Sequence, residues 1–236
     1  MPTKRSDMTE FQRFAVYYAP RPGAFSDFAN GWLGWDAVRG RAVPHPDIPG
    51  LPLPIEALTR APRKYGFHGT LKPPFRLRDG QSRAALEARI AELAARLAPV
   101  ICDGLDLRRI GRFLALTPRG DTRALSDLAA TVVRDLDPFR AAPGLGELER
   151  RRAAGLSPRQ NAYLESWGYP YVMDEFRFHL TLTDKLSDTK AKQTQTVLEQ
   201  AITPLPPQPF EMTDLCLFGE AADGRFHLLH RYALSG

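Results

Sequence analysis

The sequence predicts an α+β fold in which antiparallel strands carry helices on one side. Three observations support this fold class. Two stretches have the apolar spacing of amphipathic helices, short apolar runs end at Pro or Gly, and the pattern Phe-His-x-Thr-Leu occurs twice. The two copies, at residues 67–71 and 178–182, fall in different halves of the 236-residue chain. A chain of this length can bury a substantial hydrophobic core.

The chain begins with a predicted strand at residues 14–18, which ends before Pro20, and continues with a short helix at 24–32. The Pro- and Gly-rich residues 40–62 are expected to form an ordered loop. The first motif strand follows, and we expect Pro73-Pro74 to end it. The clearest helix covers residues 82–97, with Ser82 as its N-cap and an apolar stripe of Leu86, Ile90, Leu93 and Leu97.

Beyond this helix, strands are predicted at residues 105–107 and 113–116, then a helix at 123–136. A connector at 138–170 contains predicted helices near 146–154 and at 158–167. Its basic run Glu149-Arg150-Arg151-Arg152 is interpreted as a solvated helix face, because no aromatic residues alternate with it as they do in nucleic-acid-binding segments. After the second motif strand, we expect a helix at 188–201 and strands at 212–218 and 226–234.

The composition is that of a basic globular protein. The formal net charge is +5 and the pI is about 9.4, which favours an anionic ligand. No apolar run approaches the ~18 residues of a membrane span, and no signal-peptide pattern is present, so we expect a cytoplasmic protein without membrane contact. Cys102 and Cys216 lie far apart in the sequence, and we expect two buried thiols in a reducing compartment.

Each motif places a histidine and a threonine on one strand face, because side chains alternate with period two. One face of the first copy is expected to hold Gly66, His68, Thr70 and Lys72. One face of the second is expected to hold Arg177, His179, Thr181 and Thr183. The Phe and Leu residues of both motifs point the other way, under a helix. Tyr17 falls on the opposite face from its neighbours in the first strand. The sequence thus predicts a common cleft with an imidazole, a hydroxyl and a cation from each motif.

Four interpretations of the paired histidines follow from the residues alone. Each can be a hydrogen-bonded strand residue without a function, but two copies in matching contexts disfavour coincidence. A metal site is disfavoured because no third ligand stands at metal-type spacing near either motif, so neither a metal nor another cofactor is expected. Nucleophilic catalysis lacks a nucleophile-elbow or Cys-His signature. Paired acid–base catalysis at a phosphodiester needs only residues that are present.

Histidine suits this chemistry because it titrates near neutral pH. One neutral ring can accept a proton from water while the other, protonated, donates to the leaving oxygen, and each transfer contributes about 10²- to 10⁴-fold. The hydroxyls of Thr70 and Thr181 can donate hydrogen bonds to the non-bridging oxygens. Lys72 or Arg177 can offset the developing negative charge.

The motif residues resemble a known family. The pair His68-Gly69-Thr70-Leu71 and His179-Leu180-Thr181-Leu182 is similar to the twin His-x-Thr/Ser signature of the 2H phosphoesterases. The flanks Lys72-Pro73-Pro74-Phe75 and Trp167-Gly168-Tyr169-Pro170-Tyr171 resemble the DUF1045 branch, whose members are linked to phosphonate metabolism. The resemblance covers about residues 12–234. One departure is Gly69, where Ala is commoner in that branch; glycine weakens a strand but leaves the chemistry in place.

The resemblance implies one LigT-like domain over residues 1–236, with two pseudo-symmetric lobes of antiparallel sheet, helices on the outer faces and a central cleft. It implies His68 and His179 as acid and base, and Thr70 and Thr181 as phosphate binders. Tyr17, Arg177 and Lys72 are additional substrate-binding candidates. The activity implied is metal-independent hydrolysis of a cyclic phosphodiester, a ribose 1,2-cyclic phosphate of phosphonate breakdown.

Two other functions stay open at this stage. The first is a cyclic phosphodiesterase for the 2′,3′-cyclic end of RNA or a nucleotide. The second is a non-catalytic module that binds phosphate ends. The expected ligand is therefore a small phosphorylated sugar or nucleotide, with an RNA end as the alternative. The sequence does not assign the acid and base roles or the oligomeric state, nor does it tell whether residues 40–62 or 138–170 cover the cleft.

Overall fold

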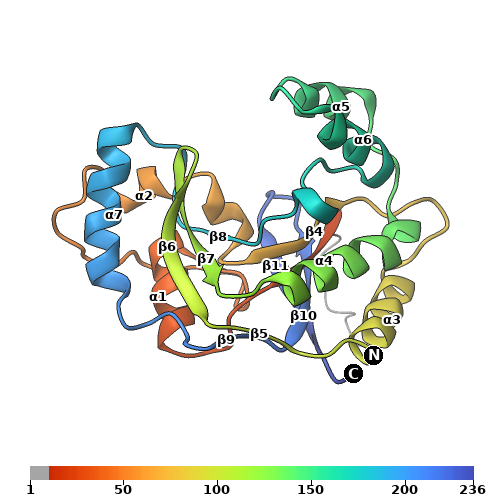
Figure 1. The fold of residues 1–236 in the computed structure, drawn as a ribbon, viewed down its shortest axis with the longest axis horizontal. Helices are drawn as coiled ribbons and strands as arrows, with labels where there is room; N and C mark the ends of the chain where they lie inside the picture. The colour runs from red at the N-terminus through yellow and green to blue at the C-terminus, as the bar shows by residue number, and fades with distance from the viewer. Residues whose placement is uncertain (1–10) are drawn as a thin grey trace, which may run out of the picture.

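The computed structural model describes residues 11–236 and is built around a seven-stranded antiparallel sheet (Figure 1). Its spatial order is β11-β10-β1-β4-β8-β7-β6. The strands in chain order are β1 (Arg13–Tyr18), β4 (Gly69–Phe75), β6 (Gly104–Ile110), β7 (Phe113–Arg119), β8 (Leu180–Thr181), β10 (Asp214–Glu220) and β11 (Phe226–Ala233). The predicted fold class, helices on an antiparallel sheet, is confirmed.

The sheet has a narrow junction at its middle. Strands β4 and β8 pair only at Gly69 and Leu180. On one side of this junction lie β11, β10, β1 and β4, and on the other lie β8, β7 and β6. Each His-x-Thr motif therefore stands where one part of the sheet meets the other. Two short ribbons, β2 (Trp35–Asp36) with β3 (Arg41–Ala42) and β5 (Val100–Cys102) with β9 (Phe210–Met212), complete the strands.

The helices divide between the two parts of the sheet, as Figure 1 shows. Helix α3 (Arg83–Ala94) packs on β10 and β11, and α4 (Arg123–Asp135) packs on β4. Helix α7 (Asp188–Ile202) packs on β6 and β7, while α1 (Ala24–Leu33) contacts the one-turn helix α2 (Ile55–Leu58). No helix in residues 11–236 combines the length and apolar character needed to cross a membrane.

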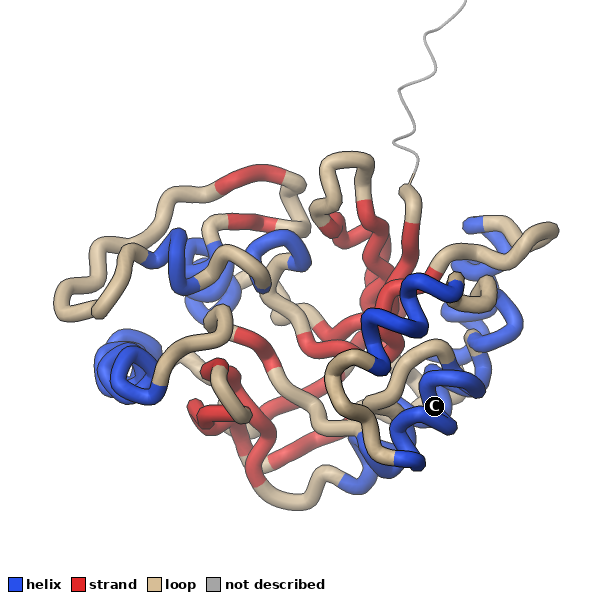
Figure 2. The backbone as a smooth tube through the Cα atoms, turned by 90° about the horizontal axis from the view of Figure 1, so that it is seen from above, coloured by secondary structure: helices blue, strands red, loops and turns tan. Residues whose placement is uncertain are grey.

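A third group of helices stands apart from the sheet. Helices α5 (Leu145–Arg152) and α6 (Pro158–Trp167) form an excursion that projects from the body of the molecule (Figure 1). Figure 2, seen from above, shows strands in the middle of the molecule and helices toward its sides. Short 3₁₀ turns flank the excursion at Asp137–Phe139 and Met173–Glu175, and another, Pro62–Tyr65, precedes the first motif. The chain returns from this excursion directly into the second motif, so α5 and α6 stay connected to the site.

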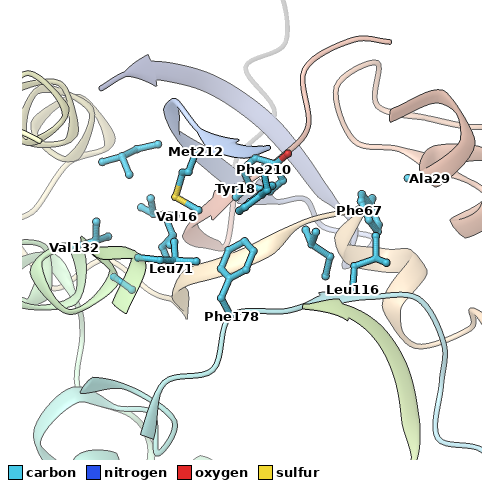
Figure 3. Close-up of a cluster of buried hydrophobic side chains, with 14 of the residues drawn as sticks. Val16, Tyr18, Ala29, Phe67, Leu71, Leu116, Val132, Phe178, Phe210 and Met212 are labelled. Atoms are coloured by element: carbon cyan, nitrogen blue, oxygen red, sulfur yellow. The ribbon is translucent and has the colours of Figure 1, made fainter. Parts of the chain in front are cut away.

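The main core lies between the sheet and its helices. The aromatic and aliphatic residues of both motifs contribute to it, and Figure 3 shows Phe67 and Leu71 of the first motif with Phe178 of the second. Phe178 packs against Phe210 of β9, with ring centroids 5.7 Å apart. Burying such side chains stabilises the fold by about 1.5–3 kcal/mol each. The expected assignment of Phe and Leu to the covered face is thus confirmed.

Two details of the motif strands differ from expectation. The first motif strand, β4, does not end before Pro73 but runs to Phe75. It pairs with β1 along one edge, and its other edge pairs with β8 only at Gly69, so that edge is unpaired at the prolines. Prolines are tolerated where a strand edge is unpaired. The second motif strand is only Leu180–Thr181 long. The residues before it follow an irregular path because the chain has just left the 3₁₀ turn at Met173–Glu175.

Candidate active site

Pairing at the junction sets the two motifs against each other. Gly69 of β4 lies opposite Leu180 of β8 in an antiparallel register. Continuing this register by one residue in each direction places His68 opposite Thr181 and Thr70 opposite His179. This extended register makes the two histidines, which stand just before β4 and β8, diagonal neighbours on one face. His68 and Thr181, from different motifs, line the same cleft, as this register implies.

Both imidazoles are anchored in the same way. His68 Nδ1 donates a hydrogen bond to the Gly66 carbonyl oxygen at 2.9 Å, and His179 Nδ1 donates to the Arg177 carbonyl oxygen at 2.8 Å. A carbonyl oxygen only accepts, so the hydrogen of each neutral ring is on Nδ1. Nε2 of each ring is then the atom with a free lone pair. The two motifs thus present matching proton-accepting atoms.

Gly66 provides the geometry that the first anchor needs. Its backbone has φ of 72°, a left-handed conformation that favours glycine. A Cβ at this position would also lie 2.7 Å from the Cβ of Ala37. The glycine therefore lets the chain turn so that its carbonyl faces the His68 ring two residues later.

Burial keeps both histidines neutral near pH 7. It lowers the pKa of His68 to about 4, against the opposing effect of the hydrogen bond to Gly66, and a positive charge on His179 lowers it further. Burial also lowers the pKa of His179, opposed by the hydrogen bond to Arg177. An anion bound between the rings would favour their protonated forms. The influence of one ring on the other also indicates that they are close.

Aromatic rings support both histidines. The ring of Tyr17 lies on that of His68, with centroids 4.0 Å apart and an angle of 30° between the planes. Phe113 of β7 contacts the His179 ring at a centroid distance of 5.6 Å. Tyr17 is 1% exposed, so its ring fixes the position of His68 rather than presenting a broad surface to the cleft.

A cleft of about 420 Å³ opens beside this arrangement. His68 and Thr181 line it, and Thr70 shares the strand face of Tyr17 through its pairing in the sheet. The other polar residues that line the cleft are Arg13, Tyr65, Arg151, Tyr169, Thr183, Asp184 and Lys185. Within residues 11–236, no group of three or more His, Cys, Asp or Glu side chains is placed to hold a metal ion.

Lys72 does not lie on the cleft face, which corrects the sequence-based expectation. Thr70 pairs with Tyr17 but Lys72 pairs with Val16, so Leu71 is an extra residue in a β-bulge. The bulge turns Lys72 to the helix-covered face. There its ammonium group donates to the carbonyl oxygen of Val133 at 3.0 Å and lies 3.7 Å from Asp137 Oδ1. A cation at the C-terminal end of α4 is favourable, so Lys72 stabilises the helix end.

Arg177 also differs from expectation. Its guanidinium is exposed and donates hydrogen bonds to two nearby backbone carbonyl oxygens, those of Asp174 at 2.9 Å and Phe176 at 2.7 Å. The part of Arg177 that reaches the site is its carbonyl group, which anchors His179. Thr183 lines the cleft as expected, but it is 1% exposed and its hydroxyl already accepts the backbone N–H of Leu114 at 2.9 Å.

Other cations near the cleft were not predicted. Arg13 makes a bidentate ion pair with Glu220, and Arg151 of α5 lies over the ring of Tyr169 at 4.9 Å. The basic run at 149–152 was the only sequence signal for Arg151. Its interpretation as a solvated face holds for Arg150 and Arg152, which are exposed, but Arg151 is half-buried.

Comparison with known proteins identifies the family of the chain. The family described as "Protein of unknown function (DUF1045)" matches residues 70–227. Two similar relatives are both named ribose 1,5-bisphosphate phosphokinase PhnN. The one from Janthinobacterium sp. (strain Marseille) is 35% identical over 203 residues, which is 85% of this chain and 45% of that protein. The one from Laribacter hongkongensis (strain HLHK9) is 36% identical over 179 residues, or 75% and 41%. The chain thus spans less than half the length of these relatives.

Solved structures of similar fold include two bacterial proteins. E. coli LigT complexed with 3′-AMP is 20% identical, with a TM-score of 0.47 over 96% of this chain and 100% of that one. The protein TT0787 of Thermus thermophilus is 15% identical, with a TM-score of 0.44 over 95% and 98%. The family match covers more than half of the sequence and includes the second motif, and the chain therefore belongs to the DUF1045 family.

Proposed function

We propose that this protein is a cyclic phosphodiesterase that uses His68 and His179 as an acid–base pair. The observation that carries the proposal is the matched anchoring of the two rings. Each donates from Nδ1 to the carbonyl two residues earlier, which leaves both Nε2 atoms available for proton transfer. Chance alone does not account for two histidines that each precede a strand and share this geometry. The matching of the motifs supports one domain with one motif in each of two lobes.

The proposed reaction is the hydrolysis of one P–O bond of a cyclic phosphodiester. A neutral imidazole Nε2 accepts a proton from water as the water oxygen bonds to phosphorus. The other imidazole, protonated when the anionic substrate binds, gives its proton to the ring oxygen that leaves. The product is a phosphomonoester and a free hydroxyl on the sugar. Thr70 and Thr181 donate hydrogen bonds to the non-bridging oxygens, where negative charge develops. No metal ion takes part.

The environments of the histidines support different roles. The pKa of His68 is lowered to about 4, so this ring stays neutral over a wide range and suits the base. His179 then serves as the acid. Burial lowers the pKa of His179 as well, so its protonated form depends on the bound anionic substrate.

The proposed substrate is a ribose 1,2-cyclic phosphate that also carries a 5-phosphate, and its product is a ribose bisphosphate. Support comes from the motif resemblance to a branch linked to phosphonate metabolism. The name of the PhnN relatives, ribose 1,5-bisphosphate phosphokinase, supports a phosphorylated ribose as the class of ligand. It supports no kinase activity for this chain, which matches less than half of those proteins.

Turnover by single-histidine variants tests the proposal. His68→Asn and His179→Asn should each abolish hydrolysis of the cyclic ribose phosphate, followed by ³¹P NMR, while the ligand still binds. His230→Asn removes an exposed histidine of β11 and is the matched control. Undiminished activity in both site variants would overturn the acid–base assignment. Binding without any hydrolysis by the unmodified protein would leave only a phosphate-binding module.

Two further measurements separate the alternatives. Activity should survive EDTA; a loss that zinc or manganese restores would replace acid–base catalysis with metal-assisted hydrolysis. A cyclic-ended oligonucleotide compared at equal concentration should be the poorer substrate. Faster cleavage of the oligonucleotide would assign the enzyme to RNA ends.

A further inference from the structure

We propose that Arg76, Arg150 and Arg151 form a second anion subsite that binds a terminal phosphomonoester of the substrate. This inference rests on the proposed function, since it assigns the part of the substrate that is not hydrolysed. It gives the helical excursion a role in selecting sugars with two phosphate groups.

The first observation is a cavity that adjoins the histidine cleft. It has a volume of about 400 Å³ and shares Arg13 and Arg151 with the cleft. Its other lining residues include Arg76, at the end of β4, and Arg150 of α5. The cleft that His68 lines and this cavity are therefore neighbours, and the side chains of Arg13 and Arg151 face both.

The second observation is the charge of this cavity. Its lining has four guanidinium groups and two carboxylates, Glu147 and Glu220. Glu220 pairs with Arg13, and Glu147 pairs with Arg151 at 2.8 Å. Arg76 and Arg150 have no ion pair with any residue in the part of the chain that the structure describes. The uncompensated charge is therefore about +2, which complements a phosphomonoester of about −1.5 to −2 at pH 7.

The third observation is the state of Arg151, which stands between the two cavities. Its side chain is 24% exposed and is held over the Tyr169 ring and by Glu147. Its Nε is closed off from solvent and has no hydrogen-bond partner among residues 11–236. A ligand would therefore meet the exposed part of this guanidinium and not Nε. Glu147 and the Tyr169 ring hold that part in place before a ligand arrives.

These observations predict that the enzyme prefers a cyclic ribose phosphate with a 5-phosphate over one with a free 5-hydroxyl. A general basic surface would not produce this preference. Guanidinium groups bind phosphate through paired N–H donors, and such charge-assisted hydrogen bonds are strong. The preference is measured as the ratio of kcat/KM for the cyclic ribose phosphate with a 5-phosphate to that for the same compound with a free 5-hydroxyl. Arg76→Gln/Arg150→Gln should lower this ratio about 10- to 100-fold.

Arg152→Gln is the matched control. This arginine belongs to the same helix but pairs with Glu165 and Asn161, away from the cavity, so its removal should leave the ratio as in the unmodified protein. An equal fall in the ratio for both variants would mean that general surface charge, not the subsite, sets the preference. An unchanged ratio in the double variant would overturn the proposal.

A binding measurement separates this proposal from the assignment of the enzyme. Ribose 5-phosphate, which has no cyclic ester, should bind the unmodified protein and His68→Asn alike in isothermal titration calorimetry. The Arg76→Gln/Arg150→Gln protein should bind it about 10- to 100-fold less tightly. If binding follows this pattern but no cyclic phosphate is hydrolysed, the subsite stands and the proposed activity fails. If ribose 5-phosphate binds equally to the double variant, the subsite fails whatever the activity.

Discussion

Replacing His68 by Asn should make folding stability less sensitive to acid. Asn keeps an N–H near the position of Nδ1, so it can still donate to the Gly66 carbonyl, but it does not titrate. In the unmodified protein, burial lowers the pKa of this histidine from about 6.5 to about 4. Between these values the unfolded chain binds a proton at this position that the folded protein does not bind. Stability is therefore lost as the pH falls from 6.5 to 4.

The size of the effect follows from the same two values. Each pH unit over which the two states differ by one proton is worth 1.36 kcal/mol, so the interval from 6.5 to about 4 amounts to about 3 kcal/mol. The free energy of unfolding can be measured by urea denaturation at pH 7.5, 6, 5 and 4. The difference between the two proteins should change by about 3 kcal/mol over this range, in favour of the variant at low pH.

Contributions from carboxylates cancel in this comparison because both proteins contain them. The difference between the two proteins should also be constant above pH 7.5, where His68 is neutral in both states, which provides an internal control. Parallel stability curves from pH 7.5 to 4 would refute the reasoning, because they would mean that the imidazole is protonated as readily in the folded protein as in the unfolded chain.

Three other predictions concern the same region. Because burial also lowers the pKa of His179, the proposed acid, kcat/KM should be highest below pH 6.5, and an optimum above pH 7.5 would contradict this lowered pKa. Lys72→Met should leave kcat/KM unchanged because the ammonium group binds the end of α4, and a tenfold fall would return Lys72 to the cleft. Gly69→Ala should destabilise the protein by about 1–3 kcal/mol, since its Cβ would lie 2.5 Å from Cε2 of Phe178. The double variant Gly69→Ala/Phe178→Leu should recover part of that loss of stability. If the stability changes of the two single variants, measured by thermal melts, simply added up in the double variant, the contact would be contradicted.

Local sequence signals predicted most of the elements. The helix expected at residues 158–167 has these bounds, and Ser82 caps α3 by accepting the N–H of Ala85 at 3.1 Å. Such features depend on a few neighbouring residues, so periodicity and capping patterns reveal them. The His and Thr faces of the motifs were predictable for the same reason.

Features that depend on distant partners were not predictable. The bulge at Leu71 exists only in the pairing of β4 with β1, and a strict period of two assigned Lys72 to the wrong face. The position of Arg151 depends on how α5 is oriented relative to the cleft. A run of three arginines does not indicate which of the three side chains faces the cleft. The contact between Gly69 and Phe178 joins the two motifs. Neither motif sequence taken alone indicates this contact.

The repetition of Phe-His-x-Thr-Leu has a structural explanation in the junction of the sheet. Two identical short segments that pair in antiparallel fashion about one residue pair are related by a local two-fold axis, here through Gly69 and Leu180. Phe and Leu of each copy then enter the core, while His and Thr of each copy lie on the other face.

A phosphorus atom near this axis would have one imidazole and one hydroxyl on either side. In-line displacement places the entering and leaving oxygens on opposite sides of phosphorus, so a two-fold pair of proton-transfer groups suits both ends of the reaction. One ring must act as the base and the other as the acid, so the surroundings of the two rings must differ. That difference would come from residues outside the repeat: Tyr17 stacks on His68 alone, and the cationic cavity beside α5 lies on one side only.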